Sequence, residues 1–162
     1  MSGGVFIGLE KKQIEVIELL AEHEKAISQL YKEYARKFPE QKDFWSKIAE
    51  EEIEHASWIF KLRSQAEKGS LYFKEGRFKT EAIKTSLEYV KSQIAEAQNS
   101  KISAKNALSV ARDLESGLIE KKFFEIFEPD CREIKQVLLN LAAATREHYN
   151  RIEKAWNNKI KF

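Results

Sequence analysis

The sequence predicts an all-α protein, a bundle of four long helices with one shorter helix between the second and third of them. The 162 residues include only two prolines and six glycines, the residues that disfavour helices most. Alanine, glutamate, lysine, leucine and isoleucine, which favour helices, are abundant. Apolar residues also recur at alternating steps of three and four, which is the spacing of a buried helical face.

Breaks in this pattern divide the chain into its helices. Pro39 and Glu40 suit the start of the second helix, because proline is favoured in the first turn. Thr80 can cap the short helix, and Asp130, three residues before Glu133, resembles a capping box. We expect helices over residues of about 10–37, 40–67, 81–98, 104–127 and 130–158, a flexible N-terminus over 1–9 and a crossover over 68–103.

Composition places the whole chain, 1–162, in one domain and excludes several classes of partner. The 43% hydrophobic and 33% charged residues suit a single domain with its own core. Lysine plus arginine (28) nearly balances aspartate plus glutamate (26), and the signs are interleaved, so no footprint for nucleic acid is present. No apolar run approaches the roughly 20 residues of a membrane span. Without a signal-peptide pattern, and with Cys131 as its single cysteine, the chain is expected to be cytoplasmic.

Every long helix carries a polar residue in the middle of its apolar face. Glu50, Glu51 and Glu54 point away from the face of the second helix, and His23 is expected to be exposed. The faces consist of Ile17, Leu20, Glu24, Ile27, Tyr31, Tyr34 and Phe38; of Trp45, Ile48, Glu52, His55, Ile59, Leu62 and Ala66; of Ala104, Leu108, Ala111, Glu115, Leu118, Ile119, Phe123 and Ile126; and of Ile134, Leu138, Leu141, Thr145, His148 and Ile152.

These interrupting residues are expected to meet. Burying an unpaired carboxylate or imidazole is costly, so such groups are normally paired or bound to a metal. Carboxylate oxygens with a little imidazole suit iron or manganese better than a metal that prefers thiolates. Taken alone, His148 is better explained as a core histidine, and Glu24 or Glu115 as a surface glutamate. Together they favour a metal site formed by Glu24, Glu52, His55, Glu115 and His148.

Four stretches carry a resemblance to a known family: EHEKAISQLYKEYA, AEEEIEHASWI, ALSVARDLESGLIEKKFF and LLNLAAATREHYNRI. From about residue 10 to 158, the chain resembles the ferritin-like superfamily, and most closely the erythrin domain of rubrerythrins. The resemblance implies a ferritin-like four-helix bundle, with a long crossover containing a short extra helix, and a di-iron carboxylate site. The connection lengths agree, because roughly 35 residues suffice to recross a helix about 37 Å long and leave the two middle long helices parallel.

The last helix departs from the family at one ligand position. Where the resemblance implies Glu-x-x-His, this chain has Thr145 and His148, so five of the six implied ligands remain. Glu147 is a poor substitute, because neighbouring residues on a helix point about 100° apart. The resemblance implies two irons per chain if the site is intact, and one or none if it is degraded. Manganese and zinc are alternatives.

Two functions follow. In the first, the resemblance implies an oxidoreductase, a peroxidase or ferroxidase that couples ferrous oxidation to the reduction of hydrogen peroxide or dioxygen. The chain lacks two Cys-x-x-Cys pairs, so an external protein must donate the electrons. In the second, which Thr145 favours, the bundle is a metal-free or single-metal binding and scaffold protein. A homodimer is also implied, with apolar surface from residues 71–73 and 77–78, Trp156 and Phe162.

Overall fold

The computed structural model describes residues 3–68, 71–73, 80–120, 127–129 and 132–158. In chain order its elements are α1 (Gly3–Lys37), the 3-10 helix η1 (Pro39–Gln41), α2 (Lys42–Glu67), β1 (Leu71–Phe73), α3 (Thr80–Asn99), α4 (Ala104–Glu120), β2 (Phe127–Pro129) and α5 (Arg132–Asn157). The prediction of an all-α bundle is confirmed, with one short two-stranded ribbon added to it. None of the described helices is long and apolar enough to cross a membrane.

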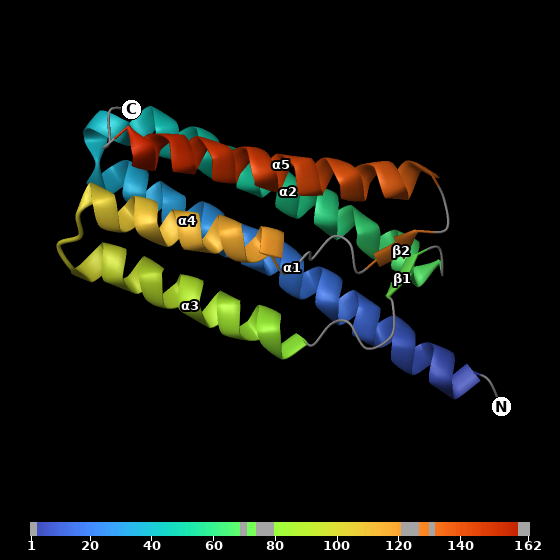
Figure 1. Cartoon of the computed structure of the whole chain (residues 1–162). Coiled ribbons are helices and arrows are strands. Elements are labelled where there is room, and N and C mark those ends of the chain that lie inside the picture. Colours follow the sequence, from blue (N-terminus) through green and yellow to red (C-terminus); the bar gives the residue numbers. More distant parts are fainter. Residues whose placement is uncertain (1–2, 69–70, 74–79, 121–126, 130–131, 159–162) are drawn as a thin grey trace.

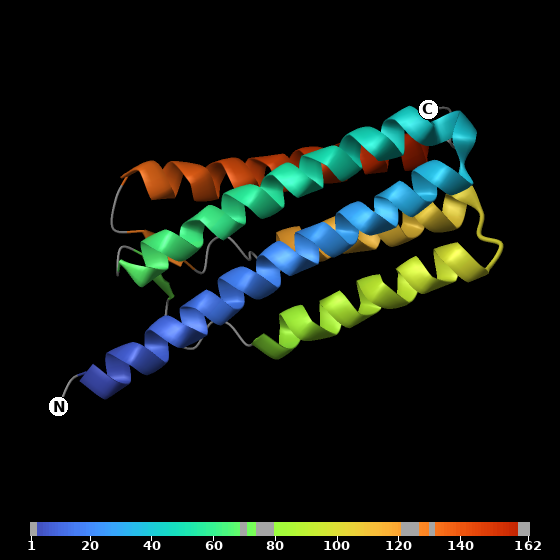
Figure 2. The ribbon, with the colours of Figure 1, turned by 180° about the vertical axis from the view of Figure 1, so that it is seen from behind.

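The helices pack lengthwise, as Figure 1 shows. Helix α1 packs against both α2 and α3, and α5 packs against α4 and α2. The long segment after α2 brings the chain back, so α2 and α4 run in the same direction while α1–α2 and α4–α5 form antiparallel pairs (Figures 1 and 2). This is the course that the connection lengths predict. The four long helices can therefore present their inner faces to one another.

Helix α1 begins earlier than expected, at Gly3 rather than near residue 10. Three glycines lie among the first eight residues, and glycine weakens a helix, which is why the expected start was later. Extending a formed helix is much easier than nucleating one, so the long segment that follows can propagate backwards through these glycines. The first turns of α1 extend past the ends of α3 and α4 (Figure 2).

The short ribbon joins two segments that are far apart in the sequence. Leu71 pairs with Pro129 and Phe73 with Phe127, in antiparallel register. The sequence interpretation was wrong at residue 127, which it assigned to a helix. Three-residue strands carry no usable periodicity, and their stability depends on a partner that a local pattern does not reveal. The side chains of residues 71–73, and all of residues 77–78 and Phe162, lie outside the described part, so their role in a dimer stays a prediction.

The core consists of the apolar faces that the sequence indicates. On α2, every predicted inward residue from Trp45 to Ala66 is buried, and on α5 the same holds from Ile134 to Ile152. Trp156 was expected to offer exposed surface, but it packs half-buried against the core, with the Arg112 guanidinium 5.5 Å from its ring centroid. The helical period therefore located the core of the described helices closely.

His23 is the clear error among the predicted surface residues. It is only 1% exposed, and its Nε2 lies 2.7 Å from the Ser86 hydroxyl oxygen on α3. The position lies outside the face that α1 presents to the other long helices, so in a bundle of four helices it would meet solvent. Helix α3 covers this second face of α1 and buries His23 there.

Candidate metal centre

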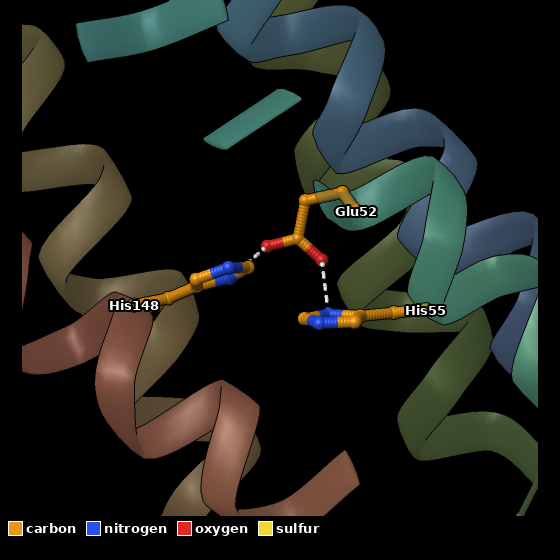
Figure 3. Close-up of side chains that lie close together, drawn as sticks. All are labelled: Glu52, His55 and His148. Carbon is orange, nitrogen blue, oxygen red and sulfur yellow. Dashed lines mark hydrogen bonds and ion pairs between the residues drawn. The ribbon is translucent and has the colours of Figure 1, made fainter. Parts of the chain in front are cut away.

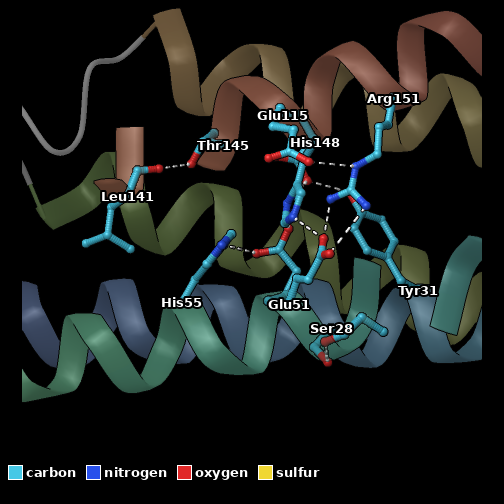
Figure 4. Close-up of polar contacts among 12 residues, drawn as sticks. Ser28, Tyr31, Glu51, His55, Glu115, Leu141, Thr145, His148 and Arg151 are labelled. Atoms are coloured by element: carbon cyan, nitrogen blue, oxygen red, sulfur yellow. Dashed lines mark hydrogen bonds and ion pairs between the residues drawn. The ribbon is translucent and has the colours of Figure 1, made fainter. Parts of the chain in front are cut away.

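Four helices deliver the polar residues of the candidate centre to one buried region (Figure 4). Helix α1 contributes Glu24, α2 contributes Glu52 and His55, and α4 contributes Glu115, while α5 contributes the remaining two. All are at most 4% exposed, namely Glu24, Glu52, His55, Glu115, Thr145 and His148. The burial that the sequence predicts for each of them is thus observed.

Glu52 lies between the two imidazoles (Figure 3). Its Oε1 is 2.8 Å from His148 Nδ1, and its Oε2 is 3.3 Å from His55 Nδ1. The two rings stack with their centroids 4.8 Å apart. One ligand atom from each of the three residues lies within 4.8 Å of the others. One oxygen and two nitrogens are therefore close enough together to serve as ligands of one metal ion.

Glu24 and Glu115 complete the carboxylate side of the centre. Both interact with Glu52 closely enough to raise their own pKa values, and the Tyr31 hydroxyl donates to Glu115 Oε1 at 2.9 Å. Within the described residues, Glu24 Oε2 and Glu115 Oε2 are buried without a hydrogen-bond partner. Leaving a buried acceptor unsatisfied costs about 1–3 kcal/mol, more if it is charged. A cation bound at the centre is the kind of partner that such oxygens lack, so the residues present fit a metal.

Burial dominates the electrostatics of the three inner carboxyls. It raises the pKa of Glu24 and of Glu115 well above 4.5. Burial also raises the pKa of Glu52, to about 7, although hydrogen bonds from Glu24 and Glu115 lower it again in part. Burial lowers the pKa of His55, which favours the neutral imidazole that binds metals. Without a cation this centre retains protons, and metal binding must release them.

Thr145 does not supply the sixth ligand. Its hydroxyl donates to the Leu141 carbonyl oxygen at 2.9 Å, one turn back along α5, as Figure 4 shows. Glu147 does not replace it, because its side chain is 70% exposed and lies 3.8 Å from Arg151 Nε. The described residues therefore offer three inner carboxylates and two imidazoles. Two divalent cations carry four positive charges, which is more than the three negative charges of those carboxylates when ionised. One divalent cation carries only two.

Glu51 is a residue that the sequence analysis missed. We expected it to point away, yet its Oε2 lies 2.9 Å from His148 Nε2, and it forms an ion pair with Arg151 of α5. Helix α5 packs against the flank of α2, so a position about 100° from Glu52 still reaches the partner helix. Arg151, three residues after His148, was the only signal in the sequence that could have indicated this contact. Glu50 and Glu54 are exposed, as expected.

The pKa of Glu51 is also affected by burial, but the Arg151 guanidinium has the larger effect, in the opposite direction. Burial raises the pKa of this half-buried carboxyl, and the hydrogen bond and positive charge of Arg151 lower it, so the net result lies below the ordinary value. The ionised form is therefore favoured in Glu51, whereas burial disfavours it in the inner carboxyls. The centre thus has an outer carboxylate that is stabilised by Arg151, beside inner carboxyls whose charge is disfavoured by burial.

Comparison with known proteins gives no identification, since no family model, no curated protein and no solved structure matches the chain.

Proposed function

We propose that this protein is a rubrerythrin-like, ferritin-type bundle that binds iron and couples ferrous oxidation to the reduction of hydrogen peroxide or dioxygen. The observation that carries the proposal is the meeting of three buried carboxyls and two imidazoles from four helices, with Glu24 Oε2 and Glu115 Oε2 unpartnered in the described part of the chain. Core polar residues with a purely structural role would be expected to satisfy each other.

The donor set favours iron or manganese over other metals. Mixed carboxylate and imidazole ligation in a helical bundle is the known setting of di-iron and di-manganese carboxylate sites. Zinc also accepts such ligands, but it performs no redox chemistry. Ferrous ions held here would supply the electrons for reducing an oxidant. Those electrons must be replaced by a separate donor protein.

Each residue has a distinct part in this proposal. Glu52, lying between His55 and His148, is suited to contact metal from both of its oxygens. Glu24 and Glu115 would balance the positive charge. The Tyr31 hydroxyl orients Glu115 through one oxygen and leaves the other free. Buried apolar residues such as Ile48 and Ile59, on the same face as Glu52, keep bulk water from the centre.

Iron stoichiometry tests the proposal directly. The protein is loaded with ferrous iron under anaerobic conditions, desalted and analysed for metal per chain. We expect bound iron in the native protein and in a Glu54→Ala control, which removes an exposed glutamate of the same helix. We expect its loss in Glu52→Ala. Equal iron in Glu52→Ala and the native protein would contradict the proposal.

Thr145 favours a second candidate, a single-metal or metal-free bundle that serves as a binding or scaffold protein. The position implied for a bridging carboxylate carries a hydroxyl that is engaged with its own helix. This candidate predicts at most one iron per chain and no change in the near-ultraviolet spectrum when peroxide is added. The oxidoreductase predicts such a change, because ferric iron bound to carboxylates absorbs there.

A further inference from the structure

The two imidazoles of the centre have different surroundings. His148 contacts carboxylates through both nitrogens, with Nδ1 at 2.8 Å from Glu52 and Nε2 at 2.9 Å from Glu51. His55 contacts Glu52 through Nδ1, at the longer distance of 3.3 Å. In the part of the chain that the structure describes, His55 Nε2 has no hydrogen-bond partner. Among the described residues, Nε2, the ring nitrogen on the far side from Glu52, thus has a carboxylate partner in His148 but not in His55.

Glu51 is itself fixed in place. Arg151 approaches it with two nitrogens, Nη2 at Oε2 and Nη1 at 3.4 Å from Oε1. The pair joins α2 to α5 beside the centre, with Glu51 28% and Arg151 27% exposed at their side chains. A carboxylate held in this way keeps its position without a metal, and it remains an acceptor for the His148 Nε2–H.

We propose that Glu51 is a positioning residue for metal binding, which holds His148 with the proton on Nε2, so that Nδ1, on the side of Glu52, carries the lone pair that binds the metal. A carboxylate that accepts the outer N–H of a histidine ligand fixes the tautomer and ring orientation and makes the inner nitrogen a better donor. His148 is therefore the stronger of the two imidazole ligands, and Glu51 acts on the metal only through it. This inference rests on the proposed metal centre.

Cobalt affinity is the first test. Co²⁺ accepts the same ligand types as Fe²⁺, is stable in air, and is titrated through its visible absorption. Removing such an outer carboxylate typically weakens metal binding roughly 10–100-fold, and we expect a loss of this size in Glu51→Ala. Glu51→Gln keeps an oxygen that can accept from Nε2–H, so it should recover part of the loss. The control Glu54→Ala should bind as the native protein does.

The second test needs no metal and reads the histidine itself. In the metal-free native protein, the side-chain ¹⁵N shifts of His148 should show one tautomer, protonated at Nε2. In Glu51→Ala they should show a mixture, while those of His55 stay unchanged. Circular dichroism of each variant verifies that the helices are retained, which separates loss of position from loss of fold.

These outcomes separate the inference from the function on which it rests. Binding of Co²⁺ within about threefold of native in Glu51→Ala would overturn the inference, since the expected loss is at least about tenfold. An equal loss in Glu51→Gln and Glu51→Ala with an unchanged tautomer would also overturn it, because Glu51 would then act on the fold alone. If Glu52→Ala binds Co²⁺ as the native protein does, the proposed function fails, and the His148 tautomer still decides whether Glu51 holds the imidazole.

Discussion

Replacing Glu52 by glutamine should remove a pH dependence from the stability of the metal-free protein. Burial raises the pKa of Glu52 from an ordinary 4.5 to about 7 in the folded protein. Between these two values the unfolded chain has released a proton that the folded chain still binds. The contribution of this group to stability is therefore complete below about pH 4.5 and is lost as the pH rises through about 7.

The size of this effect follows from the same two values. The interval from 4.5 to about 7, at about 1.4 kcal/mol for each pH unit, corresponds to about 3 kcal/mol. A glutamine at position 52 keeps the shape and a hydrogen-bonding oxygen but does not titrate. The native protein should therefore lose about 3 kcal/mol of stability relative to Glu52→Gln between pH 4.5 and 8.

Urea unfolding, followed by circular dichroism in the presence of a chelator, measures this difference at each pH. Subtracting the curve of Glu52→Gln from that of the native protein cancels most other titrating groups, among them Glu33 and Glu51, whose pKa values are lowered. Glu54→Gln serves as the control, and its curve should run parallel to that of the native protein. Parallel curves for Glu52→Gln as well would refute the reasoning, because Glu52 would then titrate as it does in the unfolded chain.

Three further predictions concern single contacts. Thr145→Glu adds a fourth carboxylate to the centre, so it should strengthen iron binding and destabilise the metal-free protein. Unchanged iron binding together with a less stable fold would mean that the metal centre does not lie beside Thr145. Tyr31→Phe removes the hydroxyl that donates to Glu115 and should lower metal-free stability by about 1–3 kcal/mol, whereas Tyr34→Phe should change it little. Ser86→Ala removes the contact between α3 and His23 and should cost about 1 kcal/mol, with faster amide exchange along α3; unchanged exchange would show that the contact does not hold α3.

The sequence predicts most of the bundle because helical periodicity carries two kinds of information at once. It shows which segments are helical and which of their residues face inward. Glu24 and Glu115 are adjacent to no other site residue in the chain, yet their positions on the apolar faces place them at the same depth as Glu52. Where a residue lies on such a face, the sequence is a sufficient guide.

The misses share a physical cause, namely contacts with elements outside the four apolar faces. His23 is buried by α3, and Glu51 is drawn to the centre by Arg151 on the flank of α5. The ribbon of β1 and β2 depends on pairing across more than fifty residues. Each of these contacts joins two separate elements. The spacing of apolar residues within one helix therefore does not indicate them.

The central claim is that metal lies among the carboxyls and imidazoles of the four helices. An anomalous difference map at the iron absorption edge, from crystals grown with ferrous iron without oxygen, tests it most directly. We expect a peak between Glu52, His55 and His148, within bonding distance of their oxygen and nitrogen atoms. A well-ordered centre without a peak, or a peak bound only to surface carboxylates, would contradict it.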